Sequence, residues 1–300
     1  MCSLLQNDEE YGFKLKILLP KLHDYTYNQN PERFGILNRI ELESTGDKYT
    51  LPEMSSQHSA VSLSEPQMIT LRLAKLMTNT ESSFDNNLLR LVIPVTIDPD
   101  LSSFNYKSLK INDSVVVAGL VEIAVDNKQY HLFKYRNDDT KKNYLFIDSV
   151  EVNTLDEFIT NTSAIITGLG FITGNLYLDR YYYQVVRYDE YKRVENILFE
   201  KKEESSITNK EIFDPYKFRV FLEQVQKLPK NVPVDLAMPY VAFSNLCNTI
   251  KTNATFARCC KLIVEGHETK HHLLRAAIYS IGIETISNLI YESNKEKIIP

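Results

Sequence analysis

The first 150 residues alternate between apolar and polar positions in short runs, which is the period expected of half-buried strands. Such runs occupy residues 13–19, 36–43, 68–73, 88–97, 114–123, 129–135 and 143–148. Pro94 lies inside one run, which predicts an edge strand or a bulge there. Asp126, Asn127 and Lys128 separate two runs by a hairpin-like turn. Short strands at hairpin spacing predict an antiparallel sheet, folded as a sandwich or a partial barrel.

The apolar period changes at residue 154. Thr154 and Glu157 have the spacing of a capping box, in which the Thr side chain accepts from the amide at Glu157 and Glu157 reaches back. Apolar residues then recur at helical spacing and predict one helix at about 154–169, ending at Gly168 or Gly170. Two more alternating runs follow, and they predict strands at residues 181–189 and 194–200.

A charged, polar run at residues 201–206 predicts a domain boundary. Beyond it, apolar spacing and proline positions predict helices at residues 214–228, 236–250, 255–264 and 273–291. We therefore expect an α+β protein, with an antiparallel β-rich N-terminal domain over residues 1–200 and an α-helical C-terminal domain over residues 201–300. Residues 295–300 provide no cap and no polar tail, so we expect the helical unit to continue past Pro300.

Composition limits the class of protein. The hydrophobic fraction of 43% is that of a soluble globular chain, and we find no secretory signal and no run of 18 apolar residues. The four cysteines have no C-x-x-C spacing, which favours a reducing, cytoplasmic setting without a membrane partner. The net charge of −5 argues against a surface that coats nucleic acid non-specifically.

His267 and His271 form an H-E-x-x-H match, the signature of zinc peptidases, which need both imidazoles on one helical face. The charged residues Lys270 and Glu265 lie where a buried zinc helix carries uncharged side chains, and Gly266 indicates a break between two helices. No third ligand occupies a recognisable motif downstream. We therefore favour a polar helix junction over a zinc hydrolase, and we predict no cofactor.

Tyrosines and arginines alternate over residues 177–193, a composition that can stack bases and hold phosphates. The residues that we assign to nucleic-acid contact are Arg180, Tyr182, Arg187 and Arg193. The competing interpretation is an ordinary strand covered on one side, because Asp179, Asp189 and Glu190 dilute the positive charge.

The stretches at residues 155–177 and about 273–298, placed after a β-rich half, resemble bacterial abortive-infection proteins of the ApeA type. Proteins of that family join a β domain to a C-terminal HEPN helical domain. The resemblance implies a protein that senses phage infection and degrades RNA, often as a dimer, here through the helical domain.

HEPN nucleases use an Arg followed by a His after four to six residues on a helix. Eight residues separate Arg258 from His267, and no other Arg–His pair meets the spacing. We therefore expect a non-catalytic recognition, sensor or scaffolding module whose partner is a phage-derived protein or RNA. The alternative is an RNase completed by catalytic residues beyond Pro300.

Overall fold

The structure is a computed structural model. It describes residues 2–7, 12–19, 40–44, 47–51, 54–56, 67–73, 75–78, 83–95, 101, 104, 107–111, 115–137, 141–175, 180–186, 197–201 and 238–298. The helix predicted at residues 214–228 and most of the predicted boundary at residues 201–206 lie outside these residues.

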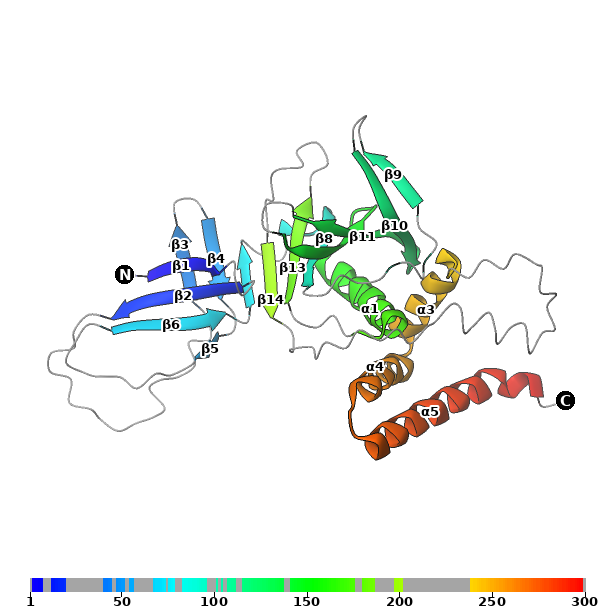
Figure 1. Ribbon diagram of the computed structural model, residues 1–300. Coiled ribbons are helices and arrows are strands. Elements are labelled where there is room, and N and C mark those ends of the chain that lie inside the picture. The colour runs from blue at the N-terminus through cyan, green and yellow to red at the C-terminus, as the bar shows by residue number, and fades with distance from the viewer. Residues whose placement is uncertain are drawn as a thin grey trace.

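The described strands form two antiparallel sheets (Figure 1). The smaller sheet has the order β1 (Cys2–Asn7), β2 (Gly12–Leu19), β6 (Gln67–Leu73) and β5 (Met54–Ser56). The larger sheet has the order β3 (Ile40–Ser44), β4 (Asp47–Leu51), β7 (Lys75–Thr78), β14 (Ile197–Lys201), β13 (Arg180–Val186), β8 (Leu88–Val95), β12 (Asn143–Ser149), β11 (Lys128–Arg136), β10 (Val115–Val125) and β9 (Lys107–Ile111).

Four described helices complete the fold: α1 (Leu155–Thr173), α3 (Tyr240–Thr252), α4 (Ala254–Glu268) and α5 (His272–Ile298). α1 lies against the larger sheet, and α3, α4 and α5 follow one another away from it (Figure 1). A β-rich first part followed by C-terminal helices confirms the predicted α+β class.

One core joins the larger sheet to α1 and α3. Alternate residues of the central strands point into it, among them Leu91, Leu132, Leu145, Ile147 and Tyr183. α1 contributes Phe158, Ile165 and Leu169, and α3 contributes Phe243 and Cys247. Each such buried apolar side chain stabilises the fold by about 1.5–3 kcal/mol. Side chains from before and after the predicted boundary therefore share one core.

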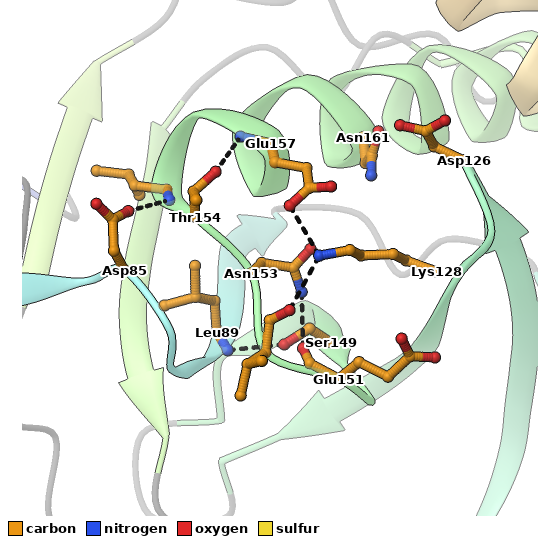
Figure 2. Close-up of polar contacts among 12 residues, drawn as sticks. Asp85, Leu89, Asp126, Lys128, Ser149, Glu151, Asn153, Thr154, Glu157 and Asn161 are labelled. Atoms are coloured by element: carbon orange, nitrogen blue, oxygen red, sulfur yellow. Dashed lines mark hydrogen bonds and ion pairs between the residues drawn. The ribbon is translucent and has the colours of Figure 1, made fainter.

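The start of α1 is held by polar contacts from three segments (Figure 2). Thr154 Oγ1 accepts from the amide of Glu157 at 3.3 Å, as the capping box predicts, and the amide of Leu155 donates to Asp85 Oδ1 at 2.8 Å. The Glu157 carboxylate pairs with Lys128 Nζ on β11 at 2.8 Å. The helix N-terminus is thereby tied to the loop before β8 and to the β10–β11 hairpin.

A buried phenol lies beneath this helix. Tyr130 Oη donates to Asn153 Oδ1 at 3.2 Å and accepts from Asn161 Nδ2 at 2.7 Å, with all three side chains almost fully buried. Burial raises the pKa of Tyr130 to about 12. The phenol therefore keeps its proton and remains a hydrogen-bond donor at neutral pH.

α1 extends further than its sequence predicts. It runs to Thr173 and ends at Gly174, whose φ of 70° is the left-handed conformation that glycine adopts at a helix C-terminus. Gly168, predicted as a stop, is instead a packing position: a Cβ there would lie 3.1 Å from Cys247 Sγ and 3.3 Å from the Phe243 ring. The glycine thus allows α1 and α3 to approach closely.

β8 is a central strand, which differs from the edge position that Pro94 predicts. β8 pairs with β12 over residues 90–95 but with β13 only over residues 88–92. Pro94 therefore lies where the pairing with β13 has ended, so its missing N–H costs no hydrogen bond on that side.

The predicted turn between β10 and β11 is present, with φ of 55° and 60° at Asp126 and Asn127, as in a type I′ turn.

The end of β10 is covered by α3 rather than by a strand. β9 pairs with β10 only up to Leu120. Beyond it, the Ala124 amide donates to Ser244 Oγ at 2.9 Å and the Ala124 carbonyl accepts from Asn248 Nδ2 at 2.9 Å. Asn248 Oδ1 also accepts from the Asp126 amide at 2.9 Å. Two side chains of one helix therefore satisfy the exposed backbone of this strand.

The substitution Asn248→Ala should lower the free energy of unfolding by about 1–2 kcal/mol, because it removes one hydrogen bond to β10 and one to the turn that follows it, each contributing about 0.5–1.5 kcal/mol. Urea unfolding followed by circular dichroism measures the difference. Asn245→Ala, at an exposed position of the same helix, should change the stability by less than about 0.5 kcal/mol. Equal losses in the two variants would contradict this role for Asn248.

Candidate nucleic-acid interface

The larger sheet has an outer face that α1 does not cover. Along β13, Tyr181, Tyr183 and Val185 are buried in the core, whereas the alternate residues are half-buried on the opposite face. Arg180 and Tyr182, two residues that the sequence assigns to nucleic-acid contact, lie on this outer face. Arg187 and Arg193, the other two, lie outside the described residues.

Aromatic side chains continue across the outer face in register. On β11, Phe133 lies opposite Phe146 of β12. Phe146 lies opposite Val92 of β8, and Val92 lies opposite Tyr182 of β13. The adjacent row places Tyr135 opposite Tyr144. The aromatic side chains of β11 and β12 thus lie on the same face as Tyr182 of β13, with Val92 of β8 between them.

The open end of this surface lies on β11 and β12. Tyr135 and Phe146 are stacked, with ring centroids 5.3 Å apart and an interplanar angle of 23°. Phe133 meets Phe146 edge to face at 5.4 Å. The Tyr135 side chain remains 46% exposed, so it presents a ring that is supported by a second ring and open to solvent.

Arg90 fixes the ring of Phe146 from β8. Its Nε and Nη2 each donate to one carboxylate oxygen of Asp148 at 2.6 Å. Its Cζ lies 4.7 Å from the centroid of the Phe146 ring and 5.9 Å from that of Phe133. The bidentate ion pair fixes the guanidinium over the aromatic side chains, a cation–π arrangement that restrains the Phe146 ring.

A basic hairpin adjoins the stacked rings. Residues 134–142 hold four basic side chains (Lys134, Arg136, Lys141 and Lys142) and two acidic ones (Asp138 and Asp139), a net charge of +2 in a chain whose total is −5. The amide of Asn137 donates to the carbonyl of Lys142 at 2.9 Å and joins the two sides of the hairpin. The hairpin next to Tyr135 is therefore net positive, with Lys134 and Arg136 at the β11 positions that alternate with Tyr135.

The opposite end of the aromatic surface is more closed. Tyr182 packs on Phe199 of β14 with ring centroids 5.1 Å apart, and Phe199 is only 1% exposed. The sequence assignment of Arg180 and Tyr182 therefore falls on the outer face but at its covered end. Tyr135 and Phe146 were missed, although the aromatic residues at the outward positions of residues 129–135 and 143–148 could have indicated them.

The two histidines of the H-E-x-x-H match lie on different segments. His267 belongs to the last turn of α4, and His271 lies in the connection before α5. His267 Nδ1 is 3.0 Å from the hydroxyl of Tyr279. α4 continues through Gly266, where we predicted a break; the glycine is a packing position, because a Cβ there would collide with Ile278 of α5 at 2.7 Å. The paired imidazoles on one helical face that zinc peptidases need are not formed.

Metal-binding and thiol chemistry find no further support among the described residues. No group of three or more His, Cys, Asp or Glu side chains among them is close enough to hold a metal ion. Burial raises the pKa of the thiols of Cys247, Cys259 and Cys260, so these side chains remain protonated.

Arg258 and His267 are nine positions apart on α4, two and a half turns, which places them on opposite sides of the helix.

Purified protein should carry far less than one equivalent of zinc, and His271→Ala should leave the zinc content unchanged, because His271 is exposed in the connection before α5, where its Nδ1 accepts from the Leu274 amide at 3.4 Å. Elemental analysis by mass spectrometry after dialysis measures the metal. Stoichiometric zinc that disappears in the His271→Ala variant would overturn this expectation.

Comparisons with protein-family models, with curated proteins and with solved structures found no match to the chain. The outer face of the larger sheet, with its stacked aromatic rings and adjoining basic hairpin, is thus the candidate site on physical grounds.

Proposed function

We propose that the protein is a non-catalytic recognition module that binds single-stranded RNA on the outer face of its larger sheet. The observation that carries the proposal is the exposed Tyr135 ring stacked on Phe146 beside a hairpin of net charge +2. Aromatic rings accept unstacked bases, and neighbouring Lys and Arg side chains hold the phosphates.

Several features of the face support a base-stacking role. A ring that receives a base has to be rigid, and here Tyr135 stacks on Phe146, which contacts the paired Arg90 guanidinium. The Arg90 charge is paired with Asp148, and the proposal assigns the contacts with phosphates to the net positive hairpin. The exposed end of the face on β11 and β12 also suits a single strand, because double-stranded RNA buries its bases inside the helix.

The biological setting that we propose follows from the sequence resemblance to ApeA-type proteins. In that setting, RNA produced during phage infection occupies the aromatic face, and the bound state signals to the rest of a defence protein. A phage-derived protein is the competing ligand. RNA is favoured here because stacked rings next to basic side chains match the chemistry of bases and phosphates.

The substitution Tyr135→Ala should weaken binding of a fluorescein-labelled single-stranded RNA of about 12 nucleotides about tenfold, since one stacked base contributes about 1–3 kcal/mol. Fluorescence anisotropy at fixed salt measures the affinity. Tyr135→Phe should bind as the parent does, because the ring is retained. Tyr240→Ala, which removes a tyrosine of similar exposure (49%) on α3, serves as the matched control.

If Tyr135→Ala and Tyr240→Ala bind this RNA equally well, the aromatic face is not the site. The same incubation, followed by a denaturing gel, tests the non-catalytic part of the proposal. Metal-free cleavage of the RNA by residues 1–300 would show an RNase and would contradict it.

Reversing two charges of the hairpin, Lys141→Glu with Lys142→Glu, should reduce RNA affinity and also flatten its dependence on salt. Each lost phosphate contact lowers the slope of log affinity against log salt by about 0.7 for a single strand. Titrations between roughly 50 and 300 mM KCl, the range in which such contacts are screened, measure the slope. Lys270→Glu, an exposed charge reversal before α5, should leave the slope unchanged.

A further inference from the structure

α5 exposes far more apolar surface than a helix of a folded protein normally does. Six large apolar side chains are between 53% and 78% exposed: Leu273, Leu274, Ile281, Ile283, Ile290 and Tyr291. A helix that is apolar all round is normally enclosed by neighbours. In the described part of the chain, α5 packs chiefly on α4, and Figure 1 shows it at the outside of the helical region.

One side of α5 is already occupied. Gly282 faces α4, because a Cβ there would lie 3.0 Å from Ile263 Cγ1, and the Gly282 carbonyl accepts from Cys259 Sγ at 3.3 Å. Ile278 and Tyr279 lie against Gly266 of α4. These contacts leave the rest of the α5 circumference for another partner.

The remaining circumference contains a regular stripe without any charge. Its members are Leu273, Ala276, Ser280, Ile283, Ser287 and Ile290, all exposed and separated by alternating steps of three and four residues. This is the heptad spacing of a helix-pairing seam. The neighbouring exposed stripe, which contains Leu274, Ala277 and Ile281, is interrupted by Glu284 and Asn288.

The uncharged stripe is complementary to itself when two copies run antiparallel. With Ser280 level with Ile283 of the second copy, Leu273 lies level with Ile290 and Ala276 lies level with Ser287. Large residues then meet large ones at the ends of the seam, and small residues meet small ones next to them, which allows close packing of the two helices. We therefore propose that α5 pairs with α5 of a second copy, antiparallel and twofold symmetric, through this stripe.

A bilayer is the competing occupant. Residues 272–292 of α5 are long and apolar enough to span a membrane by length and composition, with a mean hydropathy of 1.2 and 6% of that stretch buried. However, the stretch contains Arg275, Glu284 and Glu292. A charged side chain near the middle of a bilayer costs about 2.5–3.5 kcal/mol or more, and Glu284 would lie near the middle. A protein seam that leaves these charges at its flanks avoids that cost.

The size of the seam fits a reversible dimer. From Leu273 to Ile290 the stripe extends about 26 Å along the helix, at about 1.5 Å per residue. A pair of helices of this length buries several hundred Å² per partner, below the ~800 Å² typical of tight complexes. We therefore expect a dimer that is populated at micromolar concentrations and dissociates on dilution.

The test uses sedimentation velocity of the whole chain between about 1 and 100 μM, the range in which such a contact dissociates. The parent protein should shift from monomer to dimer. Ile283→Lys should raise the dimer dissociation constant at least about tenfold, because it brings two like charges together near the centre of the seam. Ile281→Lys, two residues away on the neighbouring stripe and exposed at 54%, is the matched control and should dimerise like the parent.

A mixing experiment tests the direction and the register. Ser280→Glu alone should also impair the dimer. An equimolar mixture of Ser280→Glu chains and Ile283→Lys chains should instead form a heterodimer, in which the introduced lysine of one chain lies opposite the introduced glutamate of the other. In a parallel pair position 283 would face position 283, so the lysine and the glutamate would lie in different layers of the seam and the mixture would recover less of the parent affinity.

Three outcomes would overturn the proposal: a monomeric parent at about 100 μM, loss of the dimer in Ile281→Lys but not in Ile283→Lys, or mixed chains that remain monomeric. Co-flotation of the parent with vesicles of phosphatidylcholine and phosphatidylglycerol, abolished equally by both lysine substitutions, would also overturn it and would assign α5 to a membrane.

Discussion

The burial of α1 against one face of the larger sheet is the constraint on which the structure depends. Phe158, Ile165 and Leu169 fill that face, and α3 reaches the same core through Phe243 and Cys247. The start of the helix is held by polar contacts. Asp85 and Thr154 accept hydrogen bonds from the amides of its first turn, and Lys128 forms an ion pair with Glu157. Because the inner face of the larger sheet packs against α1, the alternate residues of the central strands lie on its outer face.

That division explains why aromatic residues on β11 and β12 become a surface. Phe133, Tyr135, Tyr144 and Phe146 occupy the positions that alternate with core residues such as Leu132 and Leu145. A protein that needed only to fold could place polar side chains there. Here Arg90, paired with Asp148, lies over the Phe146 ring, and the base stacking that we propose would use this fixed ring.

Much of the fold could be predicted from local pattern, and the failures have physical reasons. Alternation located β2, β6, β11 and β12 closely, and the turn at Asp126 and Asn127 followed from its residue types. Glycine was misread at both Gly168 and Gly266, because a glycine required for close packing between helices looks in sequence like a helix stop. The site was only half predicted: Tyr182 could be read from one strand, but Phe146 and Tyr135 reach the same face of the sheet only through cross-strand register, which a single sequence does not reveal.

The cover that α3 gives to β10 has a consequence for the unfolded and partly folded protein. Strand edges with free amides and carbonyls recruit other strands, and proteins prevent this by covering or charging them. At Ala124 the protection consists of Ser244 and Asn248, more than a hundred residues away in sequence. Until that C-terminal helix has been synthesised and has docked, the edge is open, so the nascent chain passes through a period in which aggregation competes with folding.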